Sequence, residues 1–256
     1  MKAVILAGGL GTRLAEETSV KPKPMVEIGG MPILLHILKI YSYHGINEFI
    51  ICGGYKSDVI KEFFNNYFLY KSDVTFDLSN NTNIFHDNNA EPWKVTVADT
   101  GEQTMTGGRI KRIKKYLQGE KEFCLTYGDG LSDIDIGKLI KFHNSHNGKA
   151  TLTSIIPESR FGIIETKEGL VSNFLEKPNM GKNYINGGFF ILSTDIIDDI
   201  KDDSSIFEQE SLVNLSKEKE LYAYEHKGFW HPMDTLRDKI KLNKLWDEGK
   251  APWKIW

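Results

Sequence analysis

Apolar residues near the start of the chain form short continuous runs that alternate with stretches of helical spacing. Ala3 to Ala7 is entirely apolar and is followed by two glycines, which is typical of a buried parallel strand. From Ile33 to Tyr41 apolar residues recur three or four positions apart, which predicts a helix. Glu48 to Cys52 predicts a second strand and Asp58 to Tyr67 a second helix. This order predicts an α/β fold with a doubly wound, mostly parallel sheet of the Rossmann-like kind and right-handed crossovers.

The stretch from Asp77 to Trp93 breaks this order, because five asparagines crowd it and a proline lies next to its end. We therefore expect residues 69–100 to form a ribbon or loop insertion. Thr106 is a candidate N-cap for a helix that carries Ile110 and Leu117 on one face. Residues 194–256 are expected to form a C-terminal helical part. All 256 residues are expected to form a single domain.

Charge limits the classes of partner. The chain has 32 basic and 35 acidic residues and a net charge of -3, so no global basic field favours nucleic acid or an anionic membrane. We expect neither as a partner. An anionic ligand must therefore be held by a local group of residues.

Cys52 and Cys124 are the only cysteines, and each lies in an apolar run. This favours small buried side chains over a redox or metal site. The first apolar run is too short for a signal peptide or a membrane span. We therefore expect a cytoplasmic protein.

A glycine-rich loop directly after the first strand is the most informative segment. Its glycines allow a sharp turn with exposed N–H groups, which form a nest for an anion, and its arginine adds a planar cation. A dinucleotide-binding fingerprint would need glycine at Leu14, and the chain contains no Gly-Lys-Ser/Thr of a Walker A loop. The alternative is a tight turn without a ligand. The candidate nucleotide-binding residues are Leu6, Ala7, Gly8, Gly9, Leu10, Gly11, Thr12 and Arg13.

A second basic segment follows ten residues later, as Lys21-Pro22-Lys23-Pro24. Its prolines lack N–H groups and fix φ, so the segment is expected to be an extended, stiff arm. Beside the glycine loop, this arm favours a phosphate-binding role for Lys23 but not for Lys21.

The chain resembles the family of sugar-nucleotide pyrophosphorylases with the nucleotidyltransferase fold, and within it the cytidylyltransferases. The loop and the arm carry the first part of this resemblance. Further matching segments extend along nearly the whole chain: Met105 to Arg109, Tyr127 to Gly130, Ile185 to Phe190, Trp230 to Arg237 and Gly249 to Lys254.

The resemblance implies a Mg²⁺ site formed by Asp129 and Asp234. Asp129 lies between two glycines at the end of a predicted strand, where open α/β sheets bind ligands. A lone aspartate in a turn is usually a turn residue, and Asp234 is also a candidate helix N-cap. Sequence spacing alone does not show that the two carboxylates lie close together in the fold.

Further binding residues follow from the resemblance. Thr104, Arg109 and Gly128 are expected to contact the nucleotide, although Arg109 could equally belong to a solvated basic helix face. For the sugar phosphate the expected residues are Glu176, Lys177, Asn186, Gly187 and Trp230. The structural alternative for the first four residues is a surface ion pair and a turn. For Trp230 it is a partly buried position in the core.

The reaction implied by the resemblance joins CTP to α-D-glucose 1-phosphate and releases CDP-glucose and diphosphate. Arg13, Lys23 and Asp129 are the expected catalytic residues. Two alternatives stay open: dTTP or UTP as the nucleotide, and a nucleotide-binding regulator without catalysis. The resemblance also implies a homo-oligomer, of which a hexamer is one form, and a pathway to deoxysugars of surface polysaccharide.

Overall fold

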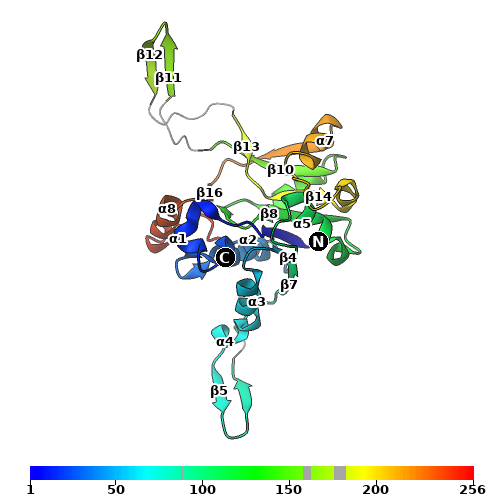
Figure 1. Cartoon of the computed structure of the whole chain (residues 1–256), viewed down its shortest axis with the longest axis vertical. Coiled ribbons are helices and arrows are strands. Elements are labelled where there is room, and N and C mark those ends of the chain that lie inside the picture. The colour runs from blue at the N-terminus through cyan, green and yellow to red at the C-terminus, as the bar shows by residue number, and fades with distance from the viewer. Residues whose placement is uncertain (88, 158–162, 176–182) are drawn as a thin grey trace.

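An eight-stranded mixed sheet forms the centre of the computed structural model, which describes residues 1–87, 89–157, 163–175 and 183–256 (Figure 1). Its order is β13-β10-β14-β8-β1-β4-β7, and β15 pairs with β10. The strands are β1 (Ala3–Ala7), β4 (Glu48–Gly53), β7 (Lys94–Asp99), β8 (Glu122–Tyr127), β10 (Ala150–Ile155), β13 (Ile185–Asn186), β14 (Phe190–Ser193) and β15 (Leu221–Glu225).

Most neighbouring strands near β1 are parallel. β1 pairs in parallel with β4 on one side and with β8 on the other, and β4 pairs in parallel with β7. β14 is antiparallel to both β8 and β10. The predicted doubly wound, mostly parallel sheet is thus confirmed. Because the chain leaves β1 toward β4 and later returns to pair β8 on the opposite side, a ligand-binding crevice is expected where β1 and β8 end.

Helices cover both faces of this sheet. Along β1, Ala3 and Ile5 belong to one apolar cluster and Val4 and Leu6 to the other, as the alternation of strand side chains requires. The first cluster includes residues of α2, α6 and α8, and the second includes residues of α5 and α7. The helices are α1 (Ala15–Thr18), α2 (Ile33–Tyr43), α3 (Ser57–Asn65), α4 (Tyr67–Lys71), α5 (Thr106–Arg112), α6 (Ile136–His143), α7 (Ser211–Lys217) and α8 (Leu236–Asp247).

Both cysteines are buried, one in each cluster. Burial raises the pKa of Cys52 and of Cys124 to about 12, so neither is a thiolate at neutral pH. The prediction of small buried side chains is confirmed. Within the described residues, no helix is both long and apolar enough to cross a membrane.

Small two-stranded sheets lie outside the central sheet. They are formed by β2 (Glu27–Ile28) with β3 (Met31–Pro32), β5 (Val74–Asp77) with β6 (Thr82–Phe85), β9 (Gly130–Ser132) with β16 (Trp230–Pro232), and β11 (Ile163–Lys167) with β12 (Leu170–Leu175). The predicted insertion at 69–100 contains the β5–β6 hairpin, which extends away from the central sheet (Figure 1). Its last part, β7, instead belongs to the central sheet.

The C-terminal part, 194–256, contains α7 and α8 as expected, but it also contains β15 and β16. Helical periodicity alone could not assign these two strands, because β15 is stabilised by pairing with β10 and β16 by pairing with β9. Beyond α8, the fully buried Trp253 anchors the chain end and donates through Nε1 to Nδ1 of His36 at 3.1 Å. Burial lowers the pKa of His36 to about 4, so this imidazole stays neutral and accepts the bond.

Thr106 differs from its predicted role as an N-cap. It is the first residue of α5, the N-cap position is Met105, and no side chain caps this end. Carbonyl groups of Asp203 and Ser205 accept from the free N–H groups of Met105 and Gly107 instead. The hydroxyl of Thr106 is therefore available for another partner.

Candidate active site

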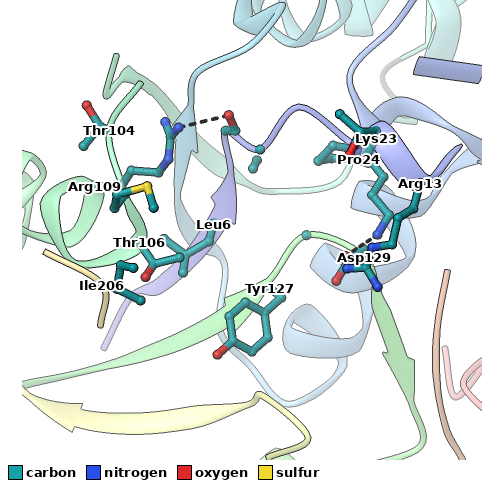
Figure 2. Close-up of a pocket in the computed structure, with 17 residues that line it drawn as sticks. Leu6, Arg13, Lys23, Pro24, Thr104, Thr106, Arg109, Tyr127, Asp129 and Ile206 are labelled. Atoms are coloured by element: carbon teal, nitrogen blue, oxygen red, sulfur yellow. Dashed lines mark hydrogen bonds and ion pairs between the residues drawn. The ribbon is translucent and has the colours of Figure 1, made fainter. Parts of the chain in front are cut away.

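A pocket of about 370 Å³ opens where β1 and β8 end. The glycine loop after β1 forms one wall, and Tyr127, Gly128 and Asp129 at the end of β8 form another. Figure 2 shows Arg13 and Lys23 beside Asp129 at one end of the pocket, with Thr104 and Arg109 at the other. The charged end suits phosphate groups and the other end suits a less polar moiety.

Arg109 holds the glycine loop from behind. Its side chain is only 5% exposed, and its guanidinium donates to several oxygens from separate segments. The acceptors are the carbonyl groups of Gly8, Gly53, Gly101 and Glu102 and the hydroxyl of Thr100, at 2.7–3.3 Å. Arg109 is therefore not part of a solvated basic face. Burial lowers the pKa of its guanidinium. Among the described residues no carboxylate hydrogen-bonds to Arg109, so it contributes positive charge behind the pocket wall.

Close packing against Arg109 explains why glycine stands at two positions of this wall. A Cβ added at Gly8 would lie 2.0 Å from Nη1 of Arg109, and one added at Gly54 would lie 2.4 Å from the same atom. A Cβ added at Gly9 would meet nothing within 4 Å. Gly8 is thus required by packing, whereas Gly9 leaves its side of the loop open to the pocket.

Two carboxylates share one ammonium at the charged end. Lys23 Nζ lies 2.6 Å from an oxygen of Asp129 and 2.7 Å from an oxygen of Asp234. The second oxygen of Asp234 accepts from Arg13 at 2.9 Å. Arg13 is largely exposed and Lys23 is largely buried, with 73% and 12% of the side chains accessible.

The β9–β16 pairing brings the two carboxylates together. Asp129 directly precedes β9 and Asp234 follows β16, and the two strands are antiparallel. Met233 N–H donates to the carbonyl of Asp129 at 2.8 Å, which extends this pairing. The predicted alternative for Asp234, an N-cap of α8, does not hold because Thr235 is the N-cap and forms a capping box with Asp238.

Burial by itself lowers the pKa of the Lys23 ammonium. The adjacent carboxylates, Asp129 first and then Asp234, more than offset this effect, so the net pKa is raised. Lys23 is therefore a permanent cation at the centre of the site. It is placed to neutralise either the two carboxylates or an incoming phosphate.

The same carboxylates are the group best suited to a divalent cation. Within the described residues, no three carboxylate, histidine or cysteine side chains are close enough to form a metal site on their own. Mg²⁺ commonly takes one or two carboxylates and completes its octahedron with phosphate oxygens and water. Asp129 and Asp234 fit that pattern and not an all-protein cage.

Most of the predicted nucleotide residues meet in this pocket. Leu6, Ala7, Gly8, Gly9, Gly11, Thr12, Arg13, Lys23, Thr104, Arg109 and Gly128 all line it. Leu10 is not among the lining residues and is 47% exposed. The guanidinium of Arg109 donates to protein oxygens, so Arg109 supports the pocket wall from behind.

Three of the predicted sugar residues, Asn186, Gly187 and Trp230, lie within the described residues and are connected to the pocket through Tyr127. Asn186 donates through Nδ2 to the hydroxyl of Tyr127 at 3.1 Å, and Trp230 donates through Nε1 to the carbonyl of Gly187 at 2.7 Å. Gly187 also donates its N–H to Thr153, so both of its backbone groups are engaged. Glu176 and Lys177 lie outside the described residues.

Some residues of the site escaped sequence reasoning. Tyr127, Thr106 and Ile206 line the pocket, and Glu208 accepts from the hydroxyls of both Tyr127 and Thr106. Tyr127 could have been proposed, since it ends the strand that precedes Asp129. Glu208 carries no sequence signal, because only the contact of its loop with α5 brings it to the site.

Sequence comparison identifies close relatives. Residues 2–246 match the family model described as nucleotidyl transferase. The glucose-1-phosphate cytidylyltransferase of Salmonella typhimurium is 58% identical over 256 residues, which are all of both proteins.

Solved structures agree in fold. HddC of Yersinia pseudotuberculosis, determined with GMP-PN, superposes with a TM-score of 0.68 at 27% identity and covers 96% of this chain and 99% of its own. The UDP-glucose pyrophosphorylase of Acinetobacter baumannii gives a TM-score of 0.68 at 20% identity over 94% of this chain and 91% of its own.

Packing around Arg109 predicts that Gly8→Ala destabilises the ligand-free protein. The new methyl group overlaps the guanidinium, which must move away from its acceptors. We expect the Tm to fall by roughly 5 °C. Differential scanning fluorimetry without ligand measures this change.

Gly9→Ala is the matched control, because its methyl group meets no neighbour. Its Tm should stay at the wild-type value. Equal Tm values for the two variants would contradict the assigned role of Gly8.

Proposed function

The chain belongs to the nucleotidyl transferase family, and on that premise we propose that it transfers the cytidylyl group of CTP to α-D-glucose 1-phosphate. The products are CDP-glucose and diphosphate. The observation that carries this proposal is the convergence of the glycine loop, Arg13 and Lys23 with Asp129 and Asp234 in one pocket. A regulator without catalysis would have no use for a charged lysine held between two carboxylates.

The choice of CTP and glucose 1-phosphate rests on relatives. The Salmonella typhimurium protein that matches the whole chain is a glucose-1-phosphate cytidylyltransferase. Cytosine differs from uracil and thymine by an amino group that donates hydrogen bonds, so a pocket selective for CTP must present an acceptor there. The end of the pocket lined by Thr104, Met105 and Thr106 is where we place the base.

The proposed chemistry needs no general base. An oxygen of the sugar phosphate is already anionic and attacks the α-phosphorus in line, and diphosphate leaves from the opposite side. The protein must bring two polyanions together and offset their repulsion. Loop N–H groups and Arg13 are placed to hold the leaving diphosphate, and Lys23 to neutralise the α-phosphate as its charge shifts.

We further propose Mg²⁺ as the cofactor, held by Asp129 and Asp234 together with nucleotide oxygens. The metal would supply positive charge to the phosphate oxygens. Lys23 spans both carboxylates, so a metal held by them would compete with its ammonium for their oxygens. The freed lysine can then turn to a phosphate.

Cell location and pathway are inferred from the substrates. Nucleoside triphosphates such as CTP are found in the cytoplasm, which supports a cytoplasmic enzyme. A nucleotide-activated glucose suits enzymes that convert the sugar into a deoxysugar while it is held by its nucleotide. Surface polysaccharide, including the O-antigen of lipopolysaccharide, is where we expect such sugars to be used.

The β5–β6 hairpin supports a homo-oligomer, of which a hexamer is one form. The hairpin stands away from the sheet, and Phe76, Leu78 and Ile84 are 56%, 91% and 54% exposed (Figure 1). An isolated two-stranded hairpin is only marginally stable in water. Phe76 and Ile84 belong to successive cross-strand pairs and so lie on opposite faces of the hairpin, and exposed apolar side chains on both faces favour a protein partner. A second copy of the chain is the partner that we propose.

A substrate grid tests the proposed reaction. CTP, dTTP, UTP and GTP are each combined with glucose 1-phosphate and mannose 1-phosphate in the presence of Mg²⁺, and diphosphate release is measured. We expect CTP with glucose 1-phosphate to give the highest kcat/KM. Equal or faster turnover with another nucleotide would assign a different specificity, and no release with any pair would indicate a binding protein.

Replacing Lys23 should have opposite effects on metal binding and on turnover. Lys23→Met leaves Asp129 and Asp234 without their shared cation, so Mn²⁺ should bind the nucleotide-free protein more tightly, by roughly tenfold. The same change removes a cation from the transition state, so kcat should fall roughly a hundredfold or more. Calorimetric titration with Mn²⁺ and steady-state kinetics give the two quantities.

Lys21→Met is the matched control for that experiment. Lys21 pairs with Glu27, outside the carboxylate cluster, at 2.9 Å. Neither Mn²⁺ affinity nor kcat should change. A Lys23→Met protein with wild-type kcat and wild-type Mn²⁺ affinity would exclude the proposed exchange.

Replacing exposed hairpin residues should lower the mass in solution. We expect the wild type to behave as an oligomer and the double variant Phe76→Ser/Ile84→Ser as a smaller species, because both side chains are exposed in the single chain. Size-exclusion chromatography with light scattering measures the mass. Ile240→Ser, an exposed site on α8, is the control and should leave the mass unchanged. A wild-type protein that is monomeric would refute the assembly.

A further inference from the structure

A relay of hydrogen bonds connects Thr106, on the nucleotide side of the pocket, with Tyr127 and Asn186 through Glu208. One oxygen of Glu208 accepts from the hydroxyl of Tyr127 at 2.7 Å, and the other accepts from the hydroxyl of Thr106 at 2.6 Å. Thr106 lies at the end where we place the base. Tyr127 leads to Asn186, the residue proposed for the sugar. Glu208 thus lies behind both binding regions.

The direction of every bond in this relay is determined by its ends. At one end, the backbone N–H of Phe207 donates to the hydroxyl oxygen of Thr106 at 2.9 Å, which in turn donates to Glu208. At the other end, the backbone N–H of Gly188 donates to Oδ1 of Asn186 at 2.9 Å. A backbone N–H can only donate, so neither end can reverse.

The branch through Asn186 follows from that constraint. Because Oδ1 of Asn186 faces the N–H of Gly188, its Nδ2 must face Tyr127, and it donates to the phenol oxygen at 3.1 Å. The phenol must therefore direct its own proton to Glu208.

Two chains of donors thus converge on one side chain. That side chain must accept at both of its polar atoms, which a carboxylate can do and an amide cannot. A glutamine here would place an NH₂ group against one of the two hydroxyls. Bonds to a charged acceptor are also shorter and stronger than neutral ones, which agrees with the two distances at Glu208.

We propose that Glu208 is a positioning residue for sugar-phosphate recognition, which it serves by fixing Asn186 through Tyr127. Within the part of the chain that the structure describes, the relay uses one N–H and one lone pair of the Asn186 amide and leaves one of each for a ligand, in a fixed orientation. Such a pair suits a sugar hydroxyl that both donates and accepts. Through Thr106, Glu208 also fixes the first turn of α5, at the nucleotide end. This inference rests on the proposed function, since it assumes a sugar-phosphate substrate.

Single variants separate the two branches. Tyr127→Phe removes only the branch to Asn186 and should raise the KM for glucose 1-phosphate by roughly tenfold, with a smaller change for CTP. Thr106→Val removes only the other branch and should mainly raise the KM for CTP. Glu208→Met removes both acceptors and should raise both KM values. Glu208→Gln keeps one acceptor and should fall between Glu208→Met and the wild type.

A double variant distinguishes positioning from general damage. If Glu208 acts on the sugar through Tyr127, Glu208→Met added to Tyr127→Phe should cause no further rise in the KM for glucose 1-phosphate. Glu210→Met is the control, since Glu210 lies on the same loop outside the relay, and its KM values should match the wild type.

Two results would overturn the role of Glu208. One is a Glu208→Met enzyme whose KM for glucose 1-phosphate stays within twofold of the wild type. The other is a double variant whose effect is the full product of the single effects. The proposed function is judged separately by wild-type turnover. All KM ratios are measured with whichever nucleotide and sugar phosphate the wild type accepts, so the two ideas can fail independently.

Discussion

The ion cluster of Lys23 with Asp129 and Asp234 is the interaction on which the site depends. It joins the arm after the glycine loop, the end of β8 and the start of α8, which are distant in sequence. A buried charge is strongly unfavourable without a partner, and here one lysine satisfies two carboxylates while each carboxylate partly offsets the burial of the lysine. The same balance of charge holds together three segments of the site and places a cation where the proposed polyphosphate substrate would bind.

Backbone geometry at the other end of the pocket depends on Arg109 in a comparable way. The guanidinium donates to carbonyl groups at or after the ends of β1, β4 and β7, of which those of Gly8 and Gly53 also accept from the N–H groups of Tyr55 and Thr100. That arrangement requires glycine at positions 8 and 54, because a side chain would displace the guanidinium. The glycine loop is therefore rigid on its inner side and open on its outer side, as a preorganised anion site needs to be.

Glu208 links Thr106, on the nucleotide side of the pocket, with Tyr127 and Asn186. Its carboxylate receives donors that begin at Phe207 N–H and Gly188 N–H, so the polarity of the wall between nucleotide and sugar is set by backbone groups and not by flexible side chains. Fixed polarity gives recognition without reorganisation when substrates bind. The site thus combines one ion-paired cation, Lys23, with walls whose hydrogen bonds have a single arrangement.

The sequence alone determined the alternation of strands and helices, the glycine turn after β1 and the burial of Cys52 and Cys124. These features follow from local patterns, namely apolar runs, helical spacing and residues with special backbone freedom. Family resemblance added the pairing of Asp129 with Asp234. Only the tertiary structure decided how that pairing is achieved, through β9 and β16, and that Arg109 faces inward to support the loop. Neither β16 nor the role of Glu208 could be predicted from the local sequence. Both depend on contacts between segments that are distant in the chain, and such a contact leaves no pattern in either segment alone.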